Sequence, residues 1–163
     1  KTQAGNDGRH RFFEHNLYLD DIDSPVFIAM RQRDFEFELS VKLCIDSGEA
    51  GVTCYMCEDE HYDIALRKKL DETEAVLKLN IGGIKHIQNT VKLSSDSAVL
   101  IVRGDNFRYN FYIENQGSET YMGSGNTKYL TSEVSGGFTG VMLGLYSIGE
   151  NSARFSDFCC SYK

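Results

Sequence analysis

The feature that most constrains the fold of this chain is a two-residue alternation of apolar and polar side chains. Between residues 35 and 43, every odd-numbered residue is Phe, Leu or Val, and the residues between them are Glu, Ser or Lys. Successive side chains of a β-strand point to opposite faces of the sheet, so this pattern predicts a strand with one buried and one hydrated face. Comparable strands are predicted at 52–57, 61–67, 77–81, 99–102, 107–114, 141–146 and 155–162.

Turn-forming residues separate these runs, and no window of about a dozen residues shows a convincing helical period of 3.6. The clearest turn signals lie at 46–48, 82–83, 104–106, 116–118 and 123–126. Many short strands at near-regular spacing predict an all-β sandwich of two antiparallel sheets. A length of 163 residues suits one domain over 1–163, in which residues 1–25 carry the weakest pattern.

The alternation also separates the side chains expected in the core from those expected to face water. The opposite parity carries Tyr55, Tyr112 and Tyr146, with the polar residues Asp63 and Asn110 as companions, and these positions are expected to be hydrated. The expected core residues are Phe35, Phe37, Leu39, Val41, Val52, Cys54, Ile64, Leu66, Phe111, Ile113, Leu143 and Leu145.

Charge and cysteine content narrow the expected partners and location. A net charge of −7 disfavours nucleic acid and anionic membranes as partners, and no apolar run approaches the roughly 18 residues of a membrane span. The five cysteines are odd in number and two are adjacent, which favours reduced thiols and a cytoplasmic location. Secretion is the alternative, because an export signal can be cleaved or lie on a longer parent chain.

No catalytic or cofactor-binding constellation is evident. Cys54 and Cys57 have a metal-like spacing, but residues three apart on a strand point to opposite faces, so they are expected to be structural thiols. Acidic clusters at 20–23, 58–60 and 71–74 are expected to be solvated loop charge. A structural calcium ion is the alternative for these oxygens, and otherwise no cofactor is expected.

One segment resembles a signature of a known family. Residues 127–146 read TKYLTSEVSGGFTGVMLGLY and are similar to a conserved stretch in the C-terminal domain of family 43 β-xylosidases and α-arabinofuranosidases. Weaker similarities follow in the same order at 28–35, 49–52, 55–62, 109–112 and 153–162, so the resemblance covers roughly 8–163. The chain departs from the family in having no tryptophan, and it begins near the family's second strand.

The resemblance implies a concanavalin A-like, or jelly-roll, sandwich. In this family a five-bladed propeller carries the catalytic carboxylates, and this chain contains no such propeller. The resemblance therefore implies a non-catalytic accessory domain that packs on a catalytic propeller and helps shape its sugar pocket, binding xylan-derived sugars weakly if at all. The alternative is a free-standing carbohydrate-binding module of the same fold.

We infer which residues would stack sugars or contact the propeller from two sources. These are the strand positions expected to face water and the family resemblance. Tyrosine and arginine are enriched at both kinds of surface, and ordinary cross-strand pairing is a third interpretation. Phe138 lies among glycines as an apolar plug, and Glu49 is the one carboxylate at the head of a glycine-containing strand. The candidate residues are Arg31, Glu49, Tyr55, His61, Asp63, Asn110, Tyr112, Phe138 and Tyr146.

Overall fold

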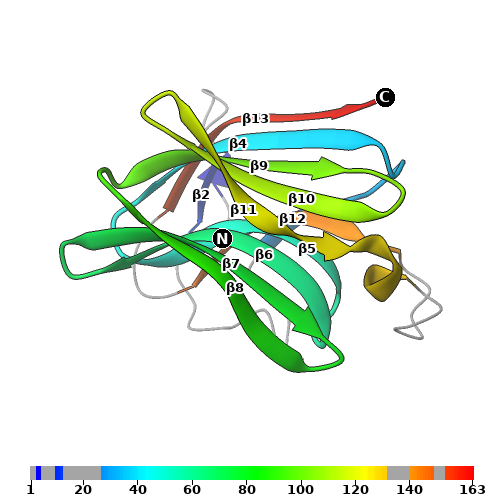
Figure 1. The fold of residues 1–163 in the computed structure, drawn as a ribbon. Coiled ribbons are helices and arrows are strands. Elements are labelled where there is room, and N and C mark those ends of the chain that lie inside the picture. Colours follow the sequence, from blue (N-terminus) through cyan, green and yellow to red (C-terminus); the bar gives the residue numbers. More distant parts are fainter. Residues whose placement is uncertain (1–2, 5–9, 13–26, 132–139, 149–152) are drawn as a thin grey trace.

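The computed structural model describes residues 3–4, 10–12, 27–131, 140–148 and 153–163, which form a sandwich of two antiparallel β-sheets (Figure 1). The all-β sandwich of two antiparallel sheets expected from the alternation is confirmed. The described part of the chain contains no helix that is long and apolar enough to cross a membrane.

Sheet A, the upper layer in Figure 1, has seven strands, and sheet B has six. In spatial order, sheet A contains β1 (Gln3–Ala4), β2 (His10–Phe12), β13 (Ala153–Tyr162), β4 (Phe37–Ile45), β9 (Ser97–Gly104), β10 (Arg108–Asn115) and β11 (Ser118–Asn126). Sheet B contains β3 (Phe27–Arg31), β12 (Met142–Ile148), β5 (Gly48–Cys57), β6 (Glu60–Lys69), β7 (Glu72–Ile81) and β8 (Ile84–Leu93). A short 3₁₀ helix, η1 (Thr127–Leu130), follows β11.

The core lies between the sheets, and eleven of the twelve residues expected in it are buried there. Phe35 was expected in the core, and this prediction is wrong, because its side chain is 47% exposed. Strand β4 begins at Phe37, so Phe35 lies in the bend before the strand, where the two-residue period no longer applies. Phe37 is buried and packs against Tyr109 and Tyr162, with ring centroids 6.1 and 6.2 Å apart.

The alternation did not predict β8 and β11, which are edge strands of the two sheets. The turn expected at 123–126 is wrong, because these residues continue β11. Gly125 lies against the ring of Tyr62, and a Cβ at this position would be 2.3 Å from Cε2 of that ring. This glycine therefore marks the close approach of a side chain from the other sheet and not a turn.

The five cysteines all lie in described strands and are free thiols. Cys54 is buried in the core, where burial raises the pKa of its thiol, whereas Cys57 is only partly buried. The two thiols therefore differ in burial, and a β-bulge between Tyr55 and Cys57 interrupts the alternation on which the opposite-face expectation rested.

Candidate functional site

The candidate residues that the sequence assigned to one face lie on different sides of the sandwich. Asn110 and Tyr112 are on β10, with side chains on the outer face of sheet A. Arg31 is exposed at the end of the edge strand β3, and Phe138 lies outside the described residues. The remaining candidates, on the outer face of sheet B, are Glu49, Tyr55, His61, Asp63 and Tyr146.

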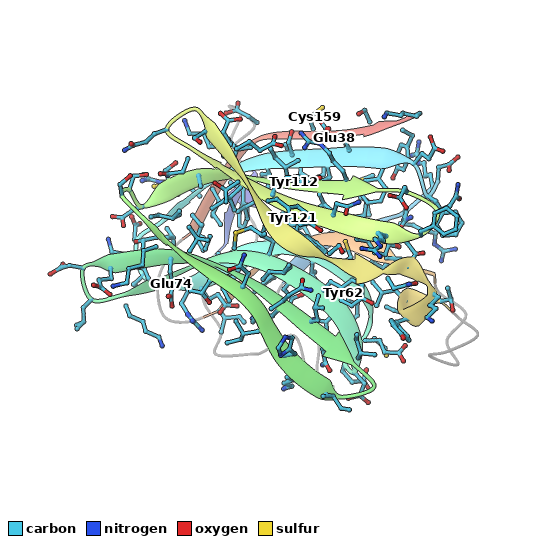
Figure 2. All side chains as sticks on the ribbon, viewed as in Figure 1. Glu38, Tyr62, Glu74, Tyr112, Tyr121 and Cys159 are labelled. Carbon is cyan, nitrogen blue, oxygen red and sulfur yellow. The ribbon has the colours of Figure 1, made fainter. Side chains whose placement is uncertain are left out.

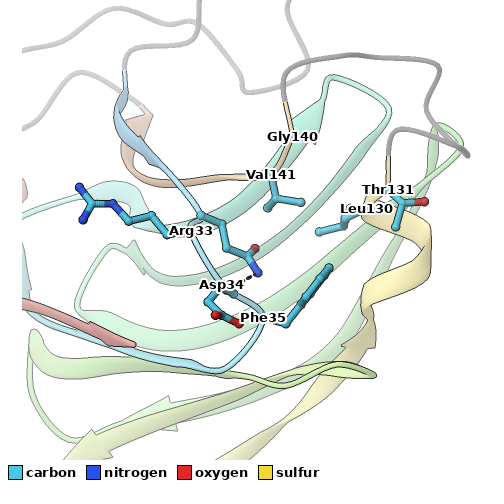
Figure 3. Close-up of a pocket in the computed structure, with 8 residues that line it drawn as sticks. Arg33, Asp34, Phe35, Leu130, Thr131, Gly140 and Val141 are labelled. Carbon is cyan, nitrogen blue, oxygen red and sulfur yellow. Dashed lines mark hydrogen bonds between the residues drawn. The ribbon is translucent and has the colours of Figure 1, made fainter. Parts of the chain in front are cut away.

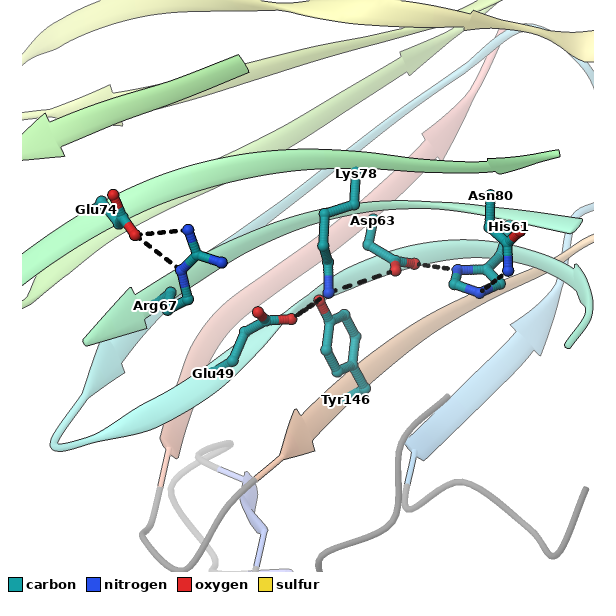
Figure 4. A network of polar contacts seen from close by, with 8 residues as sticks. All are labelled: Glu49, His61, Asp63, Arg67, Glu74, Lys78, Asn80 and Tyr146. Carbon is teal, nitrogen blue, oxygen red and sulfur yellow. Dashed lines mark hydrogen bonds and ion pairs between the residues drawn. The ribbon is translucent and has the colours of Figure 1, made fainter. Parts of the chain in front are cut away.

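Four of these sheet B residues join a polar network that crosses the sheet (Figure 4). Lys78, on β7, donates to Oε1 of Glu49 on β5, and its Nζ lies 3.9 Å from Oδ2 of Asp63 on β6. The hydroxyl group of Tyr146, on β12, donates a hydrogen bond of 2.8 Å to the same Oε1 of Glu49. One lysine thus bridges two carboxylates, and the network ties together four adjacent strands.

The network continues from Asp63 to His61 and Asn80. Nδ1 of His61 lies 2.9 Å from Oδ1 of Asp63, and Nδ2 of Asn80 lies 3.2 Å from Nε2 of His61. Asn80 also donates to the backbone oxygen of Glu58 at 2.9 Å, and the ring of Tyr55 packs 5.8 Å from the His61 ring. We call the connected set Glu49, His61, Asp63, Lys78, Asn80 and Tyr146 the sheet B network.

The expectation that these positions are hydrated is wrong for His61, Asp63 and Tyr146. Asp63 and Tyr146 are each 1% exposed, and His61 is also buried. The reason is that β6 is an inner strand of sheet B, and its first seven residues are buried on both faces. Ala65, Val76 and Tyr146 form a second, smaller apolar cluster on this outer face.

The sheet B network is a hydrogen-bonded ion cluster in which Asp63 is buried and Glu49 and Lys78 are partly exposed. A buried carboxylate is costly unless it is paired and hydrogen-bonded, and Lys78 and its neighbours meet that need for Glu49 and Asp63. A glycosidase instead needs two carboxylates that face each other across the bond to be cleaved. In the sheet B network the ammonium group of Lys78 lies against both Glu49 and Asp63, and this arrangement suits a structural role better.

The acidic clusters provide no evident metal site. Within 27–131, 140–148 and the other described segments, no group of three or more His, Cys, Asp or Glu side chains could hold a metal ion. Glu60 is buried at the start of β6, and burial, followed by the charge of Asp59, raises the pKa of its carboxyl group. The cluster at 20–23 lies outside the described residues.

A cavity of about 500 Å³ opens at one end of the sandwich (Figure 3). It is lined by Gln32, Arg33, Asp34, Phe35, Leu130, Thr131, Gly140 and Val141. Gln32 fixes its wall, because its backbone N–H donates to the oxygen of Val141 at 2.9 Å and its side-chain oxygen accepts from the Tyr109 hydroxyl at 2.8 Å. In the sequence, Thr131 and Gly140 flank the segment that carries the Gly-Gly-Phe signature, which lies outside the described residues.

The same end carries a second exposed phenylalanine. Phe107, in the turn between β9 and β10, is 74% exposed. Its backbone oxygen accepts a 3.0 Å hydrogen bond from the N–H of Thr127, which joins this turn to η1. We call the cavity together with Phe35 and Phe107 the sandwich end. Sequence reasoning missed it as a site, because Phe35 and Phe107 were both assigned to strands.

Comparison with protein families finds one match that spans nearly the whole chain. Residues 7–160 match the family described as the beta-xylosidase C-terminal concanavalin A-like domain. A non-reducing end α-L-arabinofuranosidase of Bacteroides ovatus is 28% identical over 138 residues, which are 81% of this chain and 26% of that protein. A xylosidase/arabinosidase of Butyrivibrio fibrisolvens is 26% identical over 149 residues, which are 88% of this chain and 28% of that protein.

Solved structures agree with these matches. The GH43B protein of a Bacteroides ovatus xyloglucan locus has a TM-score of 0.85 and 26% identity, and the match covers 94% of this chain and 33% of that one. The GH43 protein BlXynB of Bacillus licheniformis shares the fold with a TM-score of 0.86 at 20% identity, over 95% of this chain and 33% of that one. The present chain therefore spans about a quarter to a third of the length of these relatives.

Proposed function

This chain belongs to the family of beta-xylosidase C-terminal concanavalin A-like domains, and from that membership we propose that it is a non-catalytic accessory domain of a GH43 glycoside hydrolase. Its relatives are xylosidases and arabinofuranosidases of which it matches only a part. The proposed partner is a catalytic propeller, on which the sandwich packs and whose sugar pocket it helps to shape. The proposed substrates of the whole enzyme are xylan-derived fragments.

The observation that carries this proposal is the sandwich end. Phe35 is exposed in the lining of the cavity, and Phe107 is exposed in the turn that is hydrogen-bonded to η1, whose Leu130 also lines the cavity. Exposed apolar side chains that gather at one place mark an interaction surface more often than single ones do. Aromatic side chains are enriched in the cores of protein interfaces, where they supply much of the binding energy. The sandwich end is also next in sequence to the family signature, so we assign it as the propeller-facing surface.

The lack of catalysis by this domain is supported by the state of its best carboxylates. Glu49 and Asp63 share Lys78, and Asp63 is buried. Glycoside cleavage needs one carboxyl group that is protonated and one that is ionised, on either side of a bound sugar. In this pair, the ammonium group of Lys78 occupies the position between the carboxylates that a glycosidic bond would have to take.

The first test is hydrolysis by the purified chain. With nitrophenyl β-D-xyloside and nitrophenyl α-L-arabinofuranoside as substrates, turnover should equal that of the buffer blank. Turnover by the isolated chain that Glu49→Gln abolishes, with an unchanged circular dichroism spectrum, would show that the chain is itself an enzyme. The sequence ahead of residue 1 in the source genome provides a second test, because a catalytic propeller is expected there.

The propeller-facing role is tested in the parent enzyme. Phe35→Ser together with Phe107→Ser should lower kcat/KM or the melting temperature of the whole protein, while the isolated chain keeps its stability. Ile87→Ser, which changes an exposed apolar residue on the distant edge strand β8, is the matched control and should leave both quantities unchanged. Equal effects of the two changes would contradict the assignment.

The second candidate is a free-standing carbohydrate-binding module. It is favoured by the exposed Tyr121 and the partly exposed Tyr112 on sheet A, since modules of this kind stack sugar rings on aromatic side chains. A functionally unknown Saccharomyces cerevisiae protein has this fold over 92% of its chain, with a TM-score of 0.72 at 8% identity, so the fold also occurs nearly alone. Micromolar xylohexaose binding by the isolated chain, measured by calorimetry, would favour this candidate over the accessory role.

A further inference from the structure

We propose that the outer face of sheet A carries a weak surface site for a neutral sugar chain, with Tyr121 as the stacking platform. The proposed site comprises Tyr121, Tyr112, Arg103, Glu38 and Glu119 (Figure 2 labels three of them). These residues belong to neither the sheet B network nor the sandwich end. The choice of xylan as a probe rests on the proposed function, but the site itself does not.

The first step of the argument is a β-bulge in β11. Phe111 pairs with Gly123 and Tyr112 pairs with Tyr121, so Met122 is an extra residue on β11. Met122 points inward and is buried, whereas Tyr121 is directed outward beside Tyr112. In a regular ladder Met122 would oppose Tyr112 on the outer face and Tyr121 would point inward. The bulge therefore creates the tyrosine pair.

The two rings form a supported aromatic surface. Their centroids are 5.2 Å apart at an interplanar angle of 55°, and Tyr121 is 51% exposed. Ile101 pairs with Tyr112 on the next strand and is buried on the same face, which gives the pair an apolar floor. Within the described residues neither tyrosine hydroxyl has a hydrogen-bond partner, so both remain available to a ligand.

Arg103 adds fixed hydrogen-bonding groups beside the rings. Its guanidinium carbon lies 4.5 Å from the centroid of Tyr112, and its donors reach Glu38 at 2.7 Å and Glu119 at 2.7 and 2.9 Å. These bonds use three of the five N–H groups of a guanidinium. The remaining N–H groups and the carboxylate lone pairs give adjacent donors and acceptors, which is what the hydroxyl groups of a sugar require.

The charge of the cluster selects a neutral ligand. Two carboxylates surround one guanidinium, and the whole chain has a net charge of −7. Polyanions such as nucleic acid or a uronic acid polymer are therefore repelled. Stacking of a cationic group on Tyr112 is disfavoured as well, because Arg103 already lies on a face of that ring. A neutral pyranose chain can stack on Tyr121 and bond to the charged rim.

The size of the site limits its affinity. One exposed ring with a short polar rim contacts one or two sugar residues, and the ligand loses its own translational and rotational freedom on binding. Because Arg103 and Tyr112 are already held in place, little side-chain ordering adds to that cost. The expected dissociation constant is millimolar, which retains the enzyme near its polymer without occupying a catalytic pocket.

The test is affinity electrophoresis of the intact chain in native gels that contain soluble arabinoxylan. The chain should be retarded relative to a gel without polysaccharide, and Tyr121→Ala should remove the retardation, as expected for roughly tenfold weaker binding on loss of an aromatic contact. Ile87→Ala, at an exposed apolar residue on the edge strand β8 of sheet B, is the matched control and should be retarded like the unaltered chain. Equal melting temperatures of the three proteins exclude unfolding as the cause.

A second measurement locates the ligand. In a nuclear magnetic resonance titration with xylohexaose, the amide signals of β10 and β11 should shift, and Arg103→Lys should weaken the response because lysine lacks the planar fork. Four results would overturn the proposal: no retardation, retardation that survives Tyr121→Ala, equal retardation by polygalacturonate, or shifts confined to the sandwich end. A change in sedimentation coefficient on Tyr121→Ala without an effect on sugar binding would assign the face to self-association and overturn it too. Hydrolysis and propeller docking are separate measurements, so failure of this site leaves the proposed function standing.

Discussion

The hydroxyl group of Tyr146 donates a 2.8 Å hydrogen bond to Oε1 of Glu49, and this bond joins neighbouring strands on the buried outer face of sheet B. Lys78 bonds to the same carboxylate, and its ammonium group lies 5.6 Å from the centre of the Tyr146 ring. A glutamate, a tyrosine and a lysine from three strands therefore satisfy one another. Removing any one of them leaves the other two partly unpaired in a poorly hydrated place.

Lys78→Met should destabilise the chain by about 1–3 kcal/mol, because Glu49 and Asp63 lose the hydrogen bond and the counter-charge that offset their burial. Urea unfolding followed by circular dichroism is the measurement. The matched control is Lys92→Met, which removes an exposed ion pair with Glu72 and should change stability by less than about 0.5 kcal/mol. Equal losses in the two variants would mean that the sheet B network has no structural role.

Phe37→Ala should cost about 3–5 kcal/mol, because it removes a buried ring that packs against the buried Tyr109 and the partly buried Tyr162 and leaves a cavity. Phe35→Ala, only two positions earlier, should cost less than about 0.5 kcal/mol, since that side chain lies in the bend ahead of β4. Denaturant midpoints of the two variants decide the matter. A large loss of stability in Phe35→Ala would contradict the assignment of Phe37 as the first residue of β4.

Gly125→Ala should destabilise the chain by about 1–3 kcal/mol, because the new methyl group collides with the Tyr62 ring and forces the two sheets apart. The reason is specific to that ring, so the effect should shrink in a Tyr62→Leu background. A double-mutant cycle measures this coupling directly. If the stability losses of Gly125→Ala and Tyr62→Leu simply add, Gly125 is required for its backbone conformation and not because a side chain there would collide with the Tyr62 ring.

Asp96→Asn should make the unfolding free energy depend less on pH in the acidic range. Hydrogen bonds from Lys68 and Thr73 hold the pKa of the Asp96 carboxyl group below its ordinary value of 3.8. A lowered pKa contributes stability that is present above the ordinary value and is lost as the pH falls through the lower, folded value. The difference in unfolding free energy between the unaltered chain and the variant should therefore be largest near neutrality and shrink below about pH 4. Lys68→Gln should reproduce part of this change, and parallel profiles down to pH 2 would contradict the assignment.

How far the sequence predicted the fold depended on how each strand is covered. β4 has the core on one face and water on the other, so the alternation from Phe37 to Ile45 matches its burial residue by residue. In β6 both faces are covered, and the alternation around Ile64 gave the correct core but wrongly placed Asp63 in water. Hydropathy alone does not distinguish a hydrated polar residue from one that is buried and paired.

The candidate residues were predicted to share one face but lie on both sheets, and the reason for this error is different. Parity states which residues share a face of one strand, but it does not state which sheet the strand joins. Tyr55 and Tyr112 have the same outward parity, yet one lies on sheet B and the other on sheet A. Tyr121 was missed because its edge strand, β11, contains several serine and glycine residues and has a register that is shifted by a bulge. Only long-range pairing reveals such positions.

The extra residue at Met122 makes this surface sensitive to small changes in chain length. Deleting Met122 itself would turn Phe111–Gly123 and Tyr112–Tyr121 into successive pairs of a regular ladder, and Tyr121 would still face water. Deleting one residue between the hairpin turn and Tyr121 would instead let Met122 pair with Tyr112 and would turn Tyr121 toward the core. Gain or loss of a water-facing tyrosine in this fold is thus accessible through a single small insertion or deletion on the hairpin side of the bulge, without any substitution in the core that holds the sandwich together.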